Sequence, residues 1–357
     1  MCGWAVTPTP ATVEVLTQIW QRVLHRSPIG PKDNFFDLNG KDALADSLFA
    51  EIAQVFGREL PSATICHAPT IASLAALLEQ PTLPQFPPFV QLKAGSAKPP
   101  ILLGHGLGGR ANFSALAKHI GTGHPIYGIQ AKGVDGMEEP LTSVEDMAAF
   151  YLDALSALEP QGSCILIGYS FGGLVALEMA QRLWECGKHP ALLVLVDTYP
   201  HPRYFSPDQR LWLTAKRIGR HFSNMKKMPM RTAFAYLVQG IQRRMHIADA
   251  HSRGTLAPKP SRLSFAETTR RVRQSDLVAM KRYRPRFYRG KIKYVRPETN
   301  SYLPSDPTAI WKKLAAELEV EIVPGDHLGM VVTHFKSLAA LLSRYVEEVS
   351  RQEMSEP

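Results

Sequence analysis

The segment Cys164-Ile165-Leu166-Ile167-Gly168-Tyr169-Ser170-Phe171-Gly172-Gly173 decides the fold of this chain. An apolar run of strand length leads into it, and residues 174–180 leave it with helical periodicity. Between them lies the pattern G-x-S-x-G, whose glycines leave room for a sharp strand-to-helix turn. Such a turn raises the serine hydroxyl above the sheet and aims the free N–H groups of the helix at it. We therefore expect Ser170 to be a nucleophile rather than a small residue in a tight turn.

Residues 89–350 alternate between short apolar runs and helical stretches. The expected strands are residues 89–92, 101–103, 126–129, 165–167, 192–196, 292–295 and 320–323, and the expected helices lie near 112–120, 144–158, 172–187, 308–318 and 333–349. Short apolar strands separated by helices predict a mostly parallel sheet covered on both faces. Together with the serine turn, this pattern predicts an α/β-hydrolase fold.

The partners of the serine are predicted from their order in the chain. A serine hydroxyl needs a base to take its proton and an acid to orient that base. In this fold the order is serine, acid, histidine, and each follows a strand. Asp197 follows the run 192–196, and His327 follows 320–323. We predict Ser170 as the nucleophile, His327 as general base and then acid, and Asp197 as the residue that orients His327.

Other residues compete for these roles. Glu298 and Asp306 follow the next strand, where other hydrolases of this fold carry the acid, so both are alternatives to Asp197. Asp326 is adjacent to His327 and is poorly placed to reach its ring. Cys164 lies within a strand, where packing is the expected role. We predict no metal site, since the cysteines lack metal-ligand spacing.

Two backbone amides are expected to stabilise the oxyanion that forms on attack. Phe171 directly follows the nucleophile and supplies one N–H. The second donor is expected in the loop His105-Gly106-Leu107-Gly108-Gly109, at Leu107.

Residues 11–80 predict a small helical unit that precedes the hydrolase. Apolar residues recur at helical spacing before and after the stretch DNFFDLNG, and Thr70 is placed to cap a last helix. Residues 81–88 are rich in proline and lack periodicity, which is typical of a linker. We therefore expect domains at 11–80 and 89–350.

The N-terminal motifs resemble those of peptidyl carrier domains of nonribosomal peptide and polyketide synthetases. The resemblance rests on the segments Asp33-Asn34-Phe35-Phe36-Asp37-Leu38-Asn39-Gly40, Leu48-Phe49-Ala50-Glu51-Ile52 and Ala68-Pro69-Thr70-Ile71-Ala72-Ser73-Leu74. It implies a four-helix, all-α fold and a serine that carries a phosphopantetheine arm. Here the first of the paired glycines is Asn39, and the serine position is Asp42. A carboxylate cannot accept the arm, so this resemblance implies a carrier that cannot be loaded.

Ser47 is the alternative attachment residue, because Asp46-Ser47-Leu48 spells a local D-S-L like that around the attachment serine. That register would require five extra residues before the serine and five fewer after it. We therefore take Asp42 as the structural equivalent and expect it to cap the second helix.

The C-terminal motifs HGLGG, GYSFGG, LVDTYP and GDHLGM resemble the type I thioesterase domain that ends such synthetases. The resemblance covers roughly 88–350 and implies attack on an acyl thioester, with an acyl-enzyme on Ser170. Hydrolysis of a chain delivered by another protein's carrier, or of an acyl-CoA, is the leading interpretation, and it requires no cofactor. Cyclising or transesterifying release is a second. A non-catalytic docking protein with a degenerate carrier domain is a third.

Residues 201–290, where this family inserts a helical lid, hold most of the positive charge. The stretch 203–296 has 24 Lys and Arg residues against four acids, while the whole chain has a net charge of +9. No nucleic-acid motif accompanies this charge. We expect the lid to attract phosphates of phosphopantetheine or CoA, or an acidic carrier partner. The carrier-like unit itself has eight acidic and five basic residues over 11–80.

The composition predicts a soluble, cytoplasmic protein. Four scattered cysteines fit a reducing compartment. No apolar run approaches the length of a membrane helix, and the first residues do not resemble a secretory signal. Related two-domain proteins suggest a monomer.

Overall fold

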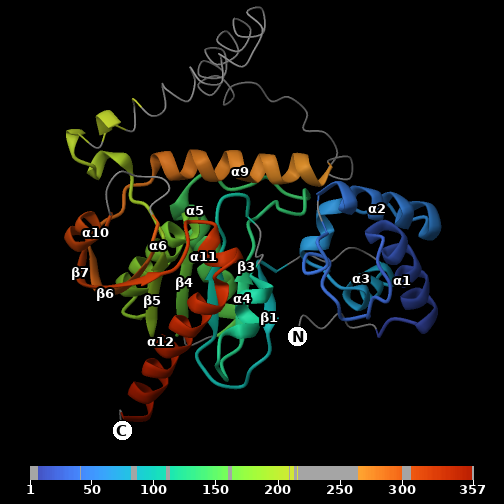
Figure 1. Cartoon of the computed structure of the whole chain (residues 1–357), viewed down its shortest axis with the longest axis horizontal. Helices are drawn as coiled ribbons and strands as arrows, with labels where there is room; N and C mark the ends of the chain where they lie inside the picture. Colours follow the sequence, from blue (N-terminus) through green and yellow to red (C-terminus); the bar gives the residue numbers. More distant parts are fainter. Residues whose placement is uncertain are drawn as a thin grey trace, which may run out of the picture.

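The computed structural model describes residues 7–40, 42–81, 87–109, 113–159, 163–208, 210–212, 215, 264–299 and 307–355, and all structural statements concern these residues. They form a helical N-terminal unit beside a larger unit built on one sheet (Figure 1). No helix among them combines the length and the apolar composition needed to cross a bilayer.

The N-terminal unit consists of α1 (Pro10–Leu24), α2 (Asp42–Phe56), the short 3₁₀ helix η1 (Ser62–Cys66) and α3 (Ile71–Leu78). The all-α carrier-like fold is confirmed, with the third of the four helices reduced to η1. Thr70 caps α3 as predicted, because its hydroxyl accepts the Ser73 N–H at 3.1 Å. We call these elements the carrier-like unit.

The larger unit contains a seven-stranded sheet in the order β1-β3-β2-β4-β5-β6-β7. The strands are β1 (Phe89–Lys93), β2 (Ile101–Gly104), β3 (Ile126–Ile129), β4 (Ile165–Tyr169), β5 (Leu192–Val196), β6 (Tyr288–Pro297) and β7 (Ala315–Val323). Only the β1–β3 pair is antiparallel. The mostly parallel α/β-hydrolase sheet is therefore confirmed.

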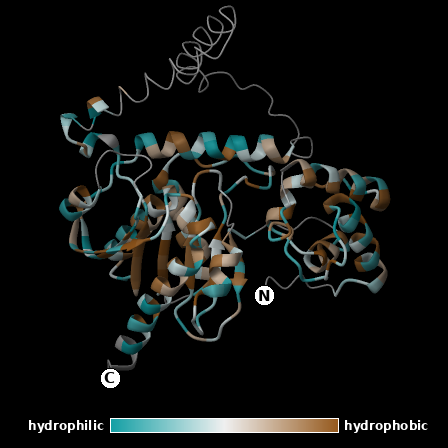
Figure 2. Cartoon of the chain, in the orientation of Figure 1, coloured by the Kyte–Doolittle hydropathy of each residue, from teal (hydrophilic) through white to brown (hydrophobic). Residues whose placement is uncertain are grey.

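Helices cover both faces of this sheet because alternate strand residues point to opposite sides. Leu102, Leu166 and Leu193 belong to one core with α5 (Val144–Leu158) and α6 (Phe171–Glu185). Ile101 and Ile165 belong to a second core with α4 (Ser114–His119), α11 (Gly329–Val332) and α12 (Phe335–Ser355). The central strands β2, β4 and β5 are accordingly apolar on both faces, as the brown strands of the sheet show (Figure 2).

One predicted element was wrong in its extent. A helix was expected near 308–318, whereas α10 (Thr308–Leu314) ends early and β7 begins at Ala315. Residues 315–319 pair in parallel with β6 and extend the edge of the sheet, so strand pairing overrides the local helical pattern there.

The predicted lid is described at its two ends. They are the 3₁₀ helix η2 (Pro202–Tyr204) and α9 (Phe265–Arg282), an 18-residue helix that lies over the larger unit and begins beside α2 (Figure 1). Most of the lid and the predicted linker lies outside the described residues.

Candidate active site

Ser170 stands on a strained turn between β4 and α6. Its backbone has φ 55° and ψ −118°, a conformation that is rare for a residue with a side chain. The turn needs its flanking glycines: a Cβ on Gly168 would lie 2.4 Å from Gly173 Cα, and one on Gly172 would lie 2.4 Å from the His105 carbonyl oxygen. The Ser170 N–H donates to the Val196 carbonyl at 2.8 Å, which ties the turn to the end of β5.

Asp197 and His327 are brought together from the ends of β5 and β7. The His327 Nδ1 atom lies 2.5 Å from Asp197 Oδ2. Asp197 is 1% exposed and has φ 42°, another strained backbone position. Because a carboxylate only accepts hydrogen bonds, Nδ1 carries the proton and Nε2 is left as the basic nitrogen.

The two competing acids that the structure describes, Asp326 and Glu298, do not make this contact. Asp326 turns back on its own loop, where Oδ1 accepts the Gly329 N–H at 2.7 Å. Glu298 is exposed just beyond β6, and Asp306 lies outside the described residues. Burial raises the pKa of the Cys164 thiol to about 12, so this cysteine is a packed residue of the core rather than a second nucleophile.

Tyr169 connects the serine turn to the histidine loop, a role that the sequence analysis missed. Its ring stacks on the His327 ring with the centroids 4.9 Å apart. Its hydroxyl donates to the His327 carbonyl oxygen at 2.8 Å. Tyr169, directly before Ser170, thus contacts both the ring and the backbone of His327. The only sequence signal for it is an aromatic residue at the first variable position of G-x-S-x-G.

The glycine-rich loop after β2 lies against Ser170. A Cβ on Gly106 would lie 3.9 Å from Ser170 Cβ, which places Leu107 at the edge of the site. Gly108 has φ +106°, a conformation open to glycine, and its N–H donates to Asp276 Oδ2 at 2.9 Å. Phe171 opens α6 immediately beyond the serine, at the positive end of the helix dipole.

Asp276 is the second residue that the sequence analysis missed. It lies on α9, far from Gly108 in sequence, and is 1% exposed. Nothing in the local sequence of α9 indicates that this carboxylate faces the loop.

Within the described residues, no group of three histidine, cysteine, aspartate or glutamate side chains is arranged to hold a metal ion. The described residues do bring together a serine on a strained turn, a histidine held by a buried carboxylate, and a glycine-rich loop beside the serine.

The predicted carrier attachment region lies at the start of α2. Asp42 is the first residue of that helix. Asn39 has φ +65°, a left-handed conformation that asparagine tolerates and glycine favours. Ser47 lies more than one turn inside α2, is exposed, and donates its hydroxyl to the Ala43 carbonyl at 3.0 Å.

Comparison with known proteins assigns both units. The sequence model of the thioesterase domain matches residues 99–346, which is more than half of the chain. The model of the phosphopantetheine attachment site matches residues 14–78. The chain therefore has the carrier-plus-thioesterase order found at the end of nonribosomal peptide synthetases.

Individual relatives are much longer proteins. The chain is 36% identical over 196 residues to a dimodular nonribosomal peptide synthase of Bacillus subtilis (strain 168), an alignment that covers 54% of this chain and 8% of that protein. It is 34% identical over 209 residues to an indigoidine synthase of Streptomyces lavendulae, covering 58% and 16%. The matched region thus spans less than a fifth of the length of either relative.

A solved structure of a four-domain nonribosomal peptide synthetase, holo-AB3403 bound to AMP and glycine, shares the fold. The superposition has a TM-score of 0.56 at 21% identity and covers 97% of this chain and 27% of that chain.

Proposed function

The chain belongs to the thioesterase family, and we propose that it releases an acyl or peptidyl chain from a phosphopantetheine thioester through an acyl intermediate on Ser170. The observation that carries the proposal is the 2.5 Å contact between His327 Nδ1 and Asp197 Oδ2, in a loop that Tyr169 ties to the serine turn. A buried carboxylate on Nδ1 leaves Nε2 as the base for the Ser170 hydroxyl.

In the first half of the reaction, His327 takes the proton from Ser170 as Oγ attacks the thioester carbonyl carbon. The new C–O bond pushes the carbonyl electron pair onto oxygen. When this pair returns, the C–S bond breaks, and His327 gives its proton to the departing thiolate. Asp197 keeps the imidazole oriented and stabilises its charged form.

We assign the oxyanion donors to the amides of Leu107 and Phe171. Both belong to segments that flank Ser170, the glycine-rich loop and the first turn of α6. Loss of one such donor costs about 10²–10³ in kcat, because the negative charge develops fully only in the transition state.

In the second half, His327 takes a proton from the acceptor as the acceptor attacks the acyl carbon, and it returns that proton to Ser170 Oγ as the bond between Oγ and the acyl carbon breaks. Water gives the free acid, and a hydroxyl or amine of the chain itself gives a ring. We propose water as the default acceptor; the mass of the product separates hydrolysis from cyclisation.

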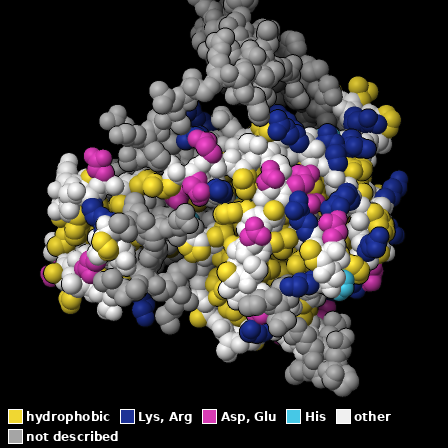
Figure 3. Space-filling view, turned by 180° about the vertical axis from the view of Figure 1, so that it is seen from behind, with side chains coloured by type: hydrophobic (Ala, Val, Ile, Leu, Met, Phe, Trp, Pro, Cys, Tyr) yellow, Lys and Arg dark blue, Asp and Glu magenta, His cyan; other side chains and the backbone are white. Residues whose placement is uncertain are grey.

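We propose that the chain to be released comes from another protein's carrier or from an acyl-CoA. Asp42, as the equivalent of the attachment serine, offers no hydroxyl for phosphopantetheine. The exposed side of α9 carries positive charge that would attract phosphate or an acidic carrier. Its exposed basic residues are Arg270, Arg273, Lys281 and Arg282. Lys and Arg side chains also gather on the side of the molecule where α9 ends (upper right in Figure 3).

The test is thioester release by matched variants. Wild-type protein and Ser47→Ala should release free thiol from an acyl-phosphopantetheine thioester at equal rates. Ser170→Ala should lower the rate by on the order of 10⁶, to the background level. Release that persists in Ser170→Ala would refute the proposed nucleophile, and release that disappears in Ser47→Ala would refute the proposed delivery in trans.

A further inference from the structure

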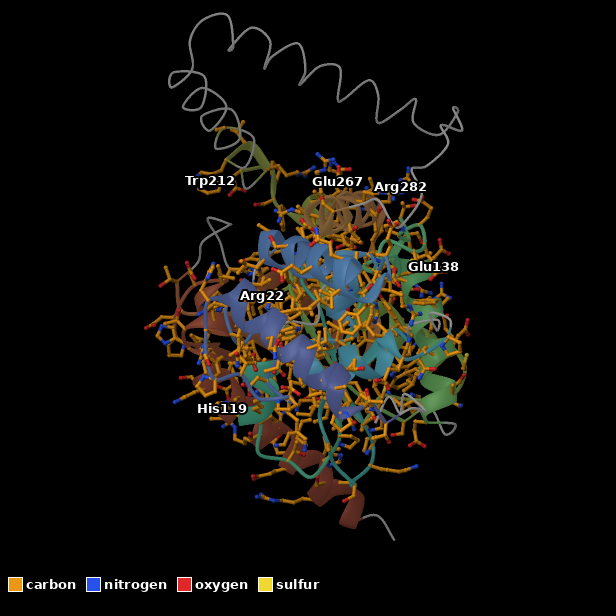
Figure 4. The ribbon with its side chains drawn as sticks, turned by 90° about the vertical axis from the view of Figure 1, so that its right-hand side faces the viewer. Arg22, His119, Glu138, Trp212, Glu267 and Arg282 are labelled. Atoms are coloured by element: carbon orange, nitrogen blue, oxygen red, sulfur yellow. The ribbon has the colours of Figure 1, made fainter. Side chains whose placement is uncertain are left out.

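The helix α9 is shared by two hydrophobic cores. Phe265 and Val272, in its first half, belong to the core of the carrier-like unit. Ala279, in its second half, belongs to the core between the sheet and α6. Figure 4 shows α9 above the helices of the carrier-like unit, with Glu267 and Arg282 labelled on it. A movement of either unit would therefore displace α9.

A carboxylate of the carrier-like unit binds the first turn of α9, in addition to the capping box that Ser264 and Glu267 form within the helix. The Phe265 N–H donates to Asp46 Oδ1 at 2.9 Å, and the Ser62 hydroxyl donates to the same oxygen at 2.5 Å. The first N–H groups of a helix have no partner within it, so an external carboxylate there both accepts a hydrogen bond and meets the positive end of the dipole.

The same helix holds the glycine-rich loop of the site through Asp276. Its Oδ2 atom accepts the Gly108 N–H at 2.9 Å. Burial raises the pKa of Asp276, and nearby His105 opposes that rise. Among the described residues, Oδ1 has no hydrogen-bond partner. A buried carboxyl that is only partly hydrogen-bonded lowers stability, so a functional reason for its presence is expected.

The contact fixes the peptide next to the proposed oxyanion donor. The Gly108 N–H belongs to the peptide group that joins Leu107 to Gly108. Its hydrogen bond to Asp276 anchors this peptide group to α9. With that peptide anchored, the adjoining Leu107 amide has less freedom to turn away from Ser170. A donor that is oriented before the reaction stabilises the oxyanion without reorganisation.

We propose that the carrier-like unit is a fixed positioning domain for the glycine-rich loop. Asp46 holds the start of α9, and α9 holds Gly108 through Asp276. The inference rests on the proposed function, and it gives a role to a carrier fold that has lost its attachment serine. Asp46 and Asp276 are positioning residues, since each acts on the reaction through the Leu107 amide.

Further contacts keep the carrier-like unit in place. Asp37 pairs with Lys118 of α4 at 2.8 Å. The Gln130 side chain donates to the Cys66 carbonyl oxygen. These contacts do not touch α9, so Asp37 provides a control that weakens the same domain interface without changing the proposed path.

The test compares matched variants of the full chain by kcat and KM for thioester release. Asp276→Leu should lower kcat by about 10–100-fold with KM nearly unchanged, somewhat less than outright loss of a donor. Asp46→Ala should lower kcat by about 3–10-fold, since α9 keeps its packing and its own Ser264 cap but loses the hydrogen bond that ties Phe265 to the carrier-like unit. Asp276→Asn and Asp46→Asn keep an acceptor oxygen and should remain near wild type, as should Asp37→Ala.

Wild-type kcat in Asp276→Leu would overturn the proposal. So would a loss at Asp276 with no loss at Asp46, because the carrier-like unit would then have no part in it. An equal loss in Asp37→Ala and Asp46→Ala would also overturn it, since general loosening of the interface would explain both.

Amide exchange gives a reading that does not depend on activity. Exchange of the Gly108 amide should be slow in the wild type and faster in Asp46→Ala than in Asp37→Ala. If the wild type shows no thioester release, the proposed function fails, while this exchange pattern still supports the positioning role. If Asp276→Leu does not fold, the comparison of Gly108 amide exchange in Asp46→Ala and Asp37→Ala still tests the proposal. A Gly108 amide that exchanges in the wild type as fast as in an unfolded peptide would overturn the inference.

Discussion

Tyr169 supports His327 by two contacts at once. The two rings stack with centroids 4.9 Å apart and planes inclined by 24°, and the Tyr169 hydroxyl donates to the His327 carbonyl oxygen at 2.8 Å. Since Tyr169 directly precedes Ser170, one short segment of chain presents the hydroxyl and also supports the base. The position of the histidine loop is thus coupled to the strained turn at the end of β4.

Removal of the Tyr169 hydroxyl should therefore weaken catalysis without abolishing it. Tyr169→Phe keeps the stacked ring and loses one hydrogen bond, worth about 1 kcal/mol, so kcat/KM for thioester release should fall about 2- to 10-fold. Tyr169→Ala loses both contacts and should fall further. Wild-type kcat/KM in both variants would show that this residue does not orient His327.

Asp197 should be the acid that His327 depends on. Asp197→Asn keeps the shape of the side chain but favours the wrong imidazole tautomer, so kcat should fall by about 10⁴. Glu298→Gln is the matched control, because Glu298 is the described competitor and lies exposed after β6. A larger loss in Glu298→Gln than in Asp197→Asn would reverse the assignment.

Loading of the carrier-like unit should depend on position 42. Incubation with CoA and a promiscuous phosphopantetheinyl transferase should leave the intact mass of the wild type unchanged, because Asp42 has no hydroxyl to modify. Asp42→Ser should gain the mass of one arm. A gain in the wild type that maps to Ser47 would show that the assigned register is wrong.

Acid should loosen the interface between the two units through His67. Burial lowers the pKa of His67 to about 3, below the ordinary value of 6.5. Between pH 6.5 and pH 3 the unfolded chain therefore binds a proton on His67 that the native chain does not. The free energy of unfolding keeps its full value above pH 6.5 and falls as the pH is lowered towards 3. At pH 5 the loss should be roughly 2 kcal/mol.

Urea unfolding at pH 5 and pH 7.5 measures this loss. His67→Leu should show a smaller drop in the free energy of unfolding between the two pH values than the wild type. Asp135 is present in both proteins, and its Oδ2 atom lies 3.9 Å from His67 Nε2. Burial raises the pKa of Asp135, so its contribution to the free energy of unfolding falls as the pH rises, opposite to that of His67. An identical drop in both proteins would show that His67 is not buried in its neutral form.

Local pattern was sufficient to predict the strands and the turn that carry the candidate site. Ser170 and Asp197 follow apolar runs and His327 follows the alternating run 320–323, and in a parallel sheet the carboxyl ends of the strands lie at one edge. The serine turn also has a local signature, since its glycines flank the strained residue. The order of the elements was therefore readable from the sequence of residues 89–350.

The contacts made by Asp276 and Asp46 were not readable in this way. Gly108 and Asp276 lie far apart in the sequence, as do Asp46 and Phe265, so only the packing of α9 brings each pair together. From the sequence alone, an aspartate in a helix rich in Lys and Arg is expected to be exposed to solvent, whereas Asp276 is buried. The helix predicted near 308–318 was too long for a related reason: residues 315–318 pair with β6, and this pairing is a tertiary contact.

The most direct test of the account is the intact mass of the protein during turnover of an acyl-phosphopantetheine thioester, with His327→Ala included to slow deacylation. We predict a mass increase of one acyl group that maps to Ser170 and is absent from Ser170→Ala. Thioester release without any acylated protein, or an acyl group on another residue, would contradict the central claim that Ser170 is the nucleophile.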